Sequence, residues 1–122
     1  MDDTRKALGN RGEEVAAGFL RQLGWKIIER NYRCRMGELD MVATDDQGVL
    51  VFVEVRTRSG SSHGLPEESV LLGKQKRLRM LAEYYLLLHP EWRNKPCRFD
   101  VLAVQLAARG EIKTVRHIKN AF

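Results

Sequence analysis

Apolar and polar positions along the chain predict two long helices and five strands. Apolar residues recur at spacings of three and four over residues 4–23 and again over 67–88, which is the spacing of one helix face. Alternating or continuous apolar runs predict strands at 25–32, 37–44, 49–56, 97–106 and 112–118. The 122 residues contain no repeats or internal linkers, so we expect a single domain over 1–122. The order α-β-β-β-α-β-β predicts an α/β fold, a mixed central β-sheet flanked by helices on both faces.

The two strands on either side of a turn at 45–48 carry acidic residues on one face. The second of them is apolar on both faces until Glu54, as in a central strand that is covered on both sides. If Thr44 pairs opposite Leu50, Asp40 falls opposite Glu54. Two carboxylates that meet at a buried strand end repel each other. A divalent cation relieves that repulsion, and oxygen ligands suit magnesium or manganese.

The first helix has an apolar stripe that contains a glycine. Gly12 costs about 1 kcal/mol of helix stability relative to alanine, so we expect it to permit a close backbone contact. Glu13 flanks the stripe, and either it reaches a site at the boundary between helix and sheet or it is a plain surface charge. Glu14 points nearly opposite the stripe and is expected to be solvated. The stripe consists of Leu8, Gly12, Val15, Phe19 and Leu23.

The second helix places a lysine on its inward face. At about 100° per residue, Lys74 falls in the middle of the apolar stripe, one turn before Leu78. Two interpretations stay open: Lys74 points at the acidic site or at a bound phosphate, or it extends outward along the apolar surface to reach solvent. The stripe consists of Leu71, Leu78, Leu81, Tyr85 and Leu88.

Basic residues surround the acidic hairpin. Arg30, Arg33 and Arg35 come just before it and either contact phosphates or balance Glu38 and Asp40. The net charge of +5 and the pI near 9.5 favour an anionic partner, although many basic proteins bind none.

A polar, glycine-rich loop is predicted at 57–66, directly after the strand that bears Glu54. Functional loops are usually found in such positions. His63 in this loop is either a proton shuttle or a solvated side chain.

Cysteine content and hydropathy predict the cellular location of the protein. Cys34 and Cys97 form no Cys-x-x-Cys pair, so reduced thiols are expected rather than a disulfide framework or a zinc site. The first ten residues lack the apolar run of a signal peptide, and no apolar stretch approaches membrane-spanning length. We therefore expect a cytoplasmic protein without membrane association.

The order of these residues resembles a known nuclease pattern. A glutamate on an N-terminal helix, an aspartate on one strand and Glu-x-(Lys/Arg) on the next strand, followed by a helix, resembles the PD-(D/E)XK nucleases. More closely, the chain resembles the YraN family, which is similar in fold and motif order to archaeal Holliday junction resolvases. The matching motifs are Gly9-x-x-Gly12-Glu13-x-x-Ala16, Arg30-Asn31-Tyr32-Arg33, Gly37-Glu38-Leu39-Asp40, Phe52-Val53-Glu54-Val55-Arg56-Thr57-Arg58, Arg98-Phe99-Asp100 and Asn120-Ala121-Phe122.

The resemblance implies a magnesium- or manganese-dependent DNA endonuclease that acts on branched or structured DNA. Carried over position by position, Glu13, Asp40 and Glu54 match the acidic metal-binding residues. Arg56 stands where the nuclease pattern usually has lysine. Arginine can stabilise the charge that develops on phosphate, but it is a poor general base. We infer from helix geometry that Lys74 supplies the missing ammonium group.

These inferences define the expected roles. Catalysis is assigned to Asp40, Glu54, Arg56 and Lys74, and DNA is the expected partner, while assembly as a homodimer stays open. Two rival functions remain: a nucleic-acid-binding module without catalysis, and a structural protein whose acidic hairpin only pairs with nearby arginines. The residues expected to bind nucleic acid are Arg33, Arg35, Arg58, Lys74 and Arg77.

Overall fold

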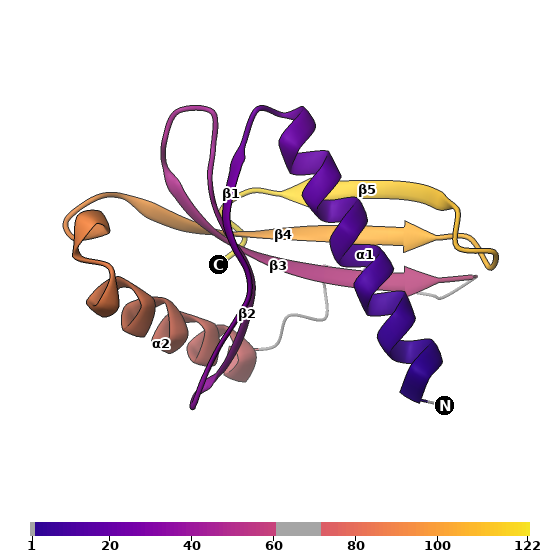
Figure 1. Cartoon of the computed structure of the whole chain (residues 1–122), viewed down its shortest axis with the longest axis horizontal. Helices are drawn as coiled ribbons and strands as arrows, with labels where there is room; N and C mark the ends of the chain where they lie inside the picture. Colours follow the sequence, from indigo (N-terminus) through magenta and orange to yellow (C-terminus); the bar gives the residue numbers. More distant parts are fainter. Residues whose placement is uncertain (1, 61–71) are drawn as a thin grey trace.

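The computed structural model describes residues 2–60 and 72–122 (Figure 1). The predicted order of elements is confirmed, with a short 3-10 helix, η2 (Pro90–Trp92), after the second helix. The helices are α1 (Asp2–Gln22) and α2 (Leu72–Leu88). The strands are β1 (Lys26–Cys34), β2 (Gly37–Thr44), β3 (Leu50–Ser59), β4 (Cys97–Leu106) and β5 (Ile112–Ile118).

The five strands form one mixed sheet in the order β1-β2-β3-β4-β5. Strands β3 and β4 run parallel, and the other neighbouring pairs are antiparallel. The parallel pair requires a crossover connection, and α2 lies within it. Thr44 pairs with Leu50, which is the pairing on which the placement of Asp40 opposite Glu54 depends.

Each face of the sheet packs against one helix, and β3 contributes to both layers by alternation. Val51 and Val53 join the cluster around α1, whereas Leu50 and Phe52 join the cluster around α2. The strand is therefore covered on both sides, as its continuous apolar run predicts. By the same alternation Glu54 lies on the α2 side.

The ends of the predicted apolar stripes are wrong. Leu23 is 44% exposed because α1 ends at Gln22, and Leu20 is the fully buried residue of the last turn. Leu88 is 53% exposed because it lies beyond Tyr85, the last fully buried side chain of α2. Ile28 was predicted to be buried, but it sits at a bulge in β1, an edge strand, and is 36% exposed.

The loop predicted at 57–66 begins later than expected. Strand β3 continues to Ser59 because β4 pairs with it along its whole length, from Leu50–Cys97 to Ser59–Leu106. The rest of that loop, including His63, lies outside the described residues, as do residues 67–71 of the second predicted helix.

The inward side chains of the β1–β2 hairpin pack in the α1 layer along one part of its length and in the α2 layer along the next. Arg30 pairs with Met41, which packs in the α1 layer, but the next pair, Tyr32 and Leu39, packs in the α2 layer. Residues two apart in a regular strand share one face, so the hairpin rotates between these two pairs. Past this point its tip reaches α2 (Figure 1). The rotation occurs at the level of Asn31.

Two of the terminal sequence motifs form a buried network around Asp100 on β4. Asp100 is fully buried and accepts hydrogen bonds from Arg98 Nε at 3.0 Å and from the backbone N–H of Asn120 at 2.9 Å. His117 Nε2 lies 2.7 Å from its other oxygen. Arg98 also donates to Asp45 at 2.8 Å, which ties β4 to the β2–β3 turn. These residues therefore anchor the C-terminal end of the chain, and this structural role accounts for the two motifs.

At Gly12 the helix α1 comes close to β3, as the place of this glycine on the apolar stripe predicts. A Cβ atom at this position would meet the Thr57 side chain, with Thr57 Cβ only 2.8 Å away. Real Cβ atoms do not approach that closely, so any larger residue would push α1 away from β3. Glu13 follows Gly12 directly, so this contact also fixes how near Glu13 comes to the end of β3.

We predict that Gly12→Ala lowers the free energy of unfolding by about 1–3 kcal/mol, the usual cost of overpacking. The matched control is Gly18→Ala in the same helix, where a Cβ would meet nothing within 4 Å. That control should raise stability by about 0.5–1 kcal/mol through helix propensity alone. Urea unfolding of both variants checks the prediction, and equal stability of the two would contradict the close contact.

Candidate active site

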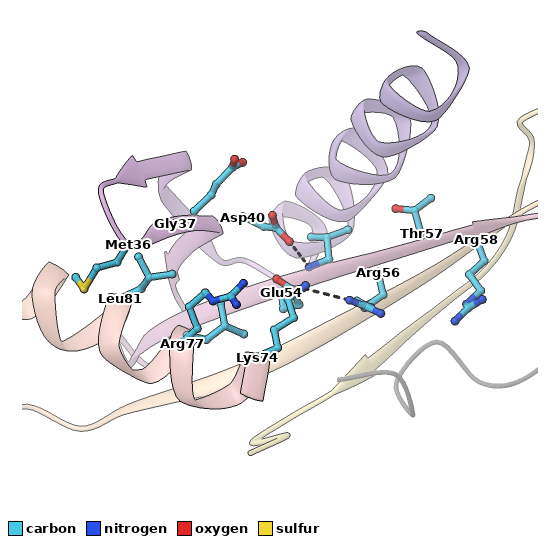
Figure 2. Close-up of a pocket in the computed structure, with 13 residues that line it drawn as sticks. Met36, Gly37, Asp40, Glu54, Arg56, Thr57, Arg58, Lys74, Arg77 and Leu81 are labelled. Atoms are coloured by element: carbon cyan, nitrogen blue, oxygen red, sulfur yellow. Dashed lines mark hydrogen bonds and ion pairs between the residues drawn. The ribbon is translucent and has the colours of Figure 1, made fainter. Parts of the chain in front are cut away.

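A cavity of about 560 Å³ opens between the end of β3, the β1–β2 hairpin and α2 (Figure 2). The end of β3 contributes mainly polar side chains to its wall, and α2 contributes two cations and two leucines. It is lined by Met36, Gly37, Glu38, Asp40, Glu54, Val55, Arg56, Thr57, Arg58, Lys74, Arg77, Leu78 and Leu81.

Glu54 is the buried carboxylate of this cavity, only 6% exposed at the end of the apolar run of β3. Two cations face it: the Lys74 ammonium contacts its Oε2 atom, and Arg56 Nη1 lies 3.6 Å from the same oxygen. Opposite charges offset part of the cost of burying a carboxylate. Of the two interpretations of Lys74, the structure shows the one in which it points at the acidic site.

Asp40 lies beside Glu54 and is mostly buried. Its side chain accepts a hydrogen bond from the backbone N–H of Val55 at 2.8 Å and is in hydrogen-bond contact with Glu54. Burial, followed by the negative charge of Glu54, raises the pKa of Asp40 to about 8. At neutral pH Asp40 therefore stays largely protonated.

Two further carboxylates approach Asp40 from the other side. Oxygen atoms of Glu13, Glu38 and Asp40 all lie within 4.8 Å of one another. Burial raises the pKa of Glu13, and the charge of Glu38 raises it further, while a hydrogen bond from Asn31 acts in the opposite direction. Glu13 therefore reaches the site, which is the first of its two interpretations, and Glu14 instead pairs with Arg30 at 2.8 Å on the surface.

The sequence interpretation omitted two members of this cluster. Glu38 was not assigned as a ligand, although it stands two residues before Asp40 on a predicted strand and so was expected on the same face. Asn31 was noted only as part of a motif. With its amide nitrogen turned toward the carboxylates, Asn31 donates to Glu13 Oε1 at 3.0 Å and to Glu38 Oε1 at 2.8 Å. No spacing rule would have found that bridge.

The residues expected to bind nucleic acid fall into two groups. Arg58 and Arg77 line the cavity together with Lys74 (Figure 2). Arg33 is 75% exposed and donates to Glu38 at 3.1 Å, so it balances an acidic residue. Arg35 is exposed in the turn between β1 and β2. Of these five expected residues, the cavity brings together three.

The carboxylates fit a hard divalent cation. Glu13, Glu38, Asp40 and Glu54 come from three different elements and offer only oxygen donors, which are the donors that magnesium and manganese prefer. Burial is the main cause of the raised pKa of Asp40, and the negative charge of Glu54 is the next, so part of the shift reflects the crowding of carboxylates. Cys34 and Cys97 are free and contribute nothing to this cluster.

No helix within residues 2–60 and 72–122 is both long enough and apolar enough to cross a membrane.

Comparison with known proteins gives consistent full-length matches. The model of "Uncharacterised protein family UPF0102" matches residues 12–104. The UPF0102 protein of Desulforamulus reducens is 53% identical over 121 residues, which covers 99% of each chain. Those of Pelotomaculum thermopropionicum and Moorella thermoacetica are 48% and 47% identical over 122 residues, the whole length of each chain. The family match includes every residue that lines the cavity.

We predict that the stability of the metal-free protein falls as the pH rises from about 4 to about 8. The unfolded chain releases the Asp40 proton near pH 4, whereas the folded protein keeps it until about pH 8. In this window the folded state binds more protons, so this residue should lower the free energy of unfolding by up to about 1.4 kcal/mol per pH unit.

Urea unfolding in EDTA at several pH values measures this slope. Asp40→Asn should remove it, and Asp46→Asn in the exposed β2–β3 turn should keep it. The same slope in wild type and Asp40→Asn would show that Asp40 does not hold the proton.

Proposed function

Because the chain belongs to the UPF0102 family, which is also called the YraN family, and the family name specifies no reaction, we propose a function from the geometry of the site. The protein hydrolyses phosphodiester bonds in DNA with the help of a divalent metal ion. The similarity of motif order to archaeal Holliday junction resolvases makes branched DNA the first substrate to assay.

One observation carries this proposal: the Asp40–Glu54 carboxylate pair faces an open cavity that also contains Arg56 and Lys74. Carboxylates that hold a metal ion, beside cations that stabilise phosphate charge, are the components that phosphodiester hydrolysis requires. Arg58 and Arg77 at the same cavity extend the positive surface over which a DNA backbone can lie.

Asp40 and Glu54 would hold the metal ion, with Glu13 and Glu38 completing the oxygen shell directly or through water. A bound magnesium or manganese ion lowers the pKa of water and polarises phosphoryl oxygens. Asp40 would release its proton to solvent on holding a cation, because burial and the charge of Glu54 raise its pKa to about 8 in the metal-free protein.

Arg56 and Lys74 would have different roles in the reaction. Arg56 would donate hydrogen bonds to the phosphate but would not accept a proton, because a guanidinium group carries only donors. Lys74 can both stabilise charge and transfer a proton, and it is 38% exposed, so its ammonium group is accessible from the cavity. Both groups contact Glu54 in the metal-free protein and are therefore already positioned beside the carboxylates.

A second candidate is a nucleic-acid-binding module that lacks catalysis. The ion pairs favour it, since Lys74 and Arg56 already balance Glu54 without any metal ion. Cleavage assays separate the two candidates. Incubation of linear, flapped and four-way DNA with magnesium or manganese should give products under the first candidate, and binding without products under the second. A protein that binds neither metal nor DNA would instead have a structural role.

We predict that DNA binding weakens steeply with salt, because lysine and arginine contacts release counterions from the backbone. Replacing Arg58 or Arg77 with alanine should weaken binding to all sequences alike and flatten the salt dependence by roughly one unit per lost phosphate contact. Arg93→Ala, at an exposed position after η2, is the control and should change neither quantity. Fluorescence anisotropy at several salt concentrations measures both. Undetectable binding at low salt would rule out DNA as the partner.

We predict that cleavage depends on both cations of the site. Arg56→Ala should lose on the order of 10²-fold in rate, as removal of one charge-stabilising donor does, whereas Arg56→Lys should retain or raise the rate. Lys74→Ala and Lys74→Met should both lower it, because methionine keeps the apolar stem and removes only the charge.

Lys76→Met, at an exposed position of the same helix, is the matched control and should cleave as wild type does. Single-turnover rates on the best DNA substrate provide the measurement. If Lys74→Met cleaves as fast as wild type, the ammonium group has no catalytic part.

A further inference from the structure

Asn31 has an unusual backbone conformation for a residue inside a strand. Its φ angle is +56°, in the left-handed region that side chains other than glycine rarely adopt. Asparagine tolerates this region better than most residues. Glycine would tolerate it at least as well, so the backbone alone does not explain why an amide side chain is needed here.

The position of Asn31 links its backbone to the site. Arg30 pairs with Met41 and Tyr32 pairs with Leu39, so Asn31 lies across from Asp40. This is the level at which the hairpin rotates from the α1 layer to the α2 layer. A residue in the left-handed region breaks the regular alternation of a strand, which accounts for a change of face at this point.

The side chain of Asn31 bridges two carboxylates from different elements. Its amide nitrogen donates to Glu13 Oε1 on α1 at 3.0 Å and to Glu38 Oε1 on β2 at 2.8 Å. An amide group has two N–H hydrogens, and this arrangement uses one on each carboxylate. Arg33 Nε holds the other oxygen of Glu38 at 3.1 Å. Two like charges are thereby kept together beside Asp40.

We propose that Asn31 is a positioning residue of the metal site, which holds Glu13 and Glu38 next to Asp40 before a cation arrives. The inference rests on the metal binding of the proposed function. Groups that orient metal ligands through hydrogen bonds often change metal affinity by about 10–100-fold when they are removed. Asn31 explains why Glu13, on a separate helix, is close enough to act with the hairpin carboxylates.

The test replaces Asn31 with glycine, which keeps the left-handed backbone accessible and removes only the amide. Asn94→Gly is the matched control, because Asn94 also has a positive φ of 65° but lies in a surface turn away from the cavity. Asn31→Asp adds a further variant, since it replaces the donor with another negative charge. Manganese binding is measured by electron paramagnetic resonance, and stability by urea unfolding in EDTA.

We expect Asn31→Gly to bind manganese about 10–100-fold more weakly than wild type, with no greater loss of stability than Asn94→Gly. Asn31→Asp should bring a further negative charge against Glu13 and Glu38 and lower the stability of the metal-free protein. Asn94→Gly should bind manganese as wild type does.

Three results would overturn the inference. If Asn31→Gly binds manganese as tightly as wild type, Asn31 is only a turn-forming residue and the proposed function stands. If weaker binding comes with a loss of stability well beyond that of Asn94→Gly, the amide is a folding contact. If wild type binds no manganese, the metal-dependent function fails and the role of Asn31 fails with it.

Discussion

The arrangement of the site depends on one buried charge, the Glu54 carboxylate at the end of an otherwise apolar strand. A carboxylate that is 6% exposed must be compensated, and Lys74, Arg56 and the proton retained by Asp40 together provide that compensation. Each comes from a different position in the fold: α2, β3 and β2. The charge therefore ties the hairpin, the central strand and the second helix into one site, and it keeps the cations beside the carboxylates without any ligand.

The first helix joins this site through close packing. Gly12 lets α1 approach Thr57, and the next residue, Glu13, is thereby brought within reach of the hairpin. The hairpin in turn rotates at Asn31, whose amide holds Glu13 and Glu38 together. A small residue, a left-handed residue and a buried ion pair thus act together to gather four carboxylates from three elements. The core of the sheet itself lies in the two apolar layers.

The sequence predicted the parts of the site that follow regular periods. With Thr44 opposite Leu50, the pairing that the structure shows, the period of a strand places Asp40 near Glu54. The helix period likewise placed Lys74 on the inward face of α2. The strand period also placed Glu38 on the face of Asp40, but it could not predict the bridge made by Asn31, because the period of two fails where Asn31 turns the hairpin. The extension of β3 to Ser59 was missed for a related reason, since it depends on pairing with β4, which is distant in sequence.

The presence of Arg56 in place of lysine changes what the rest of the site has to do. A single lysine at that position could both stabilise phosphate charge and transfer a proton, but a guanidinium group can do only the first. Lys74 contacts the same oxygen of Glu54 from another element, so an ammonium group is still available within the cavity. The contact of Lys74 with Glu54 must be exchanged for a contact with substrate. Under this proposal, therefore, the position of α2 against β3 controls the chemistry as directly as the carboxylates do.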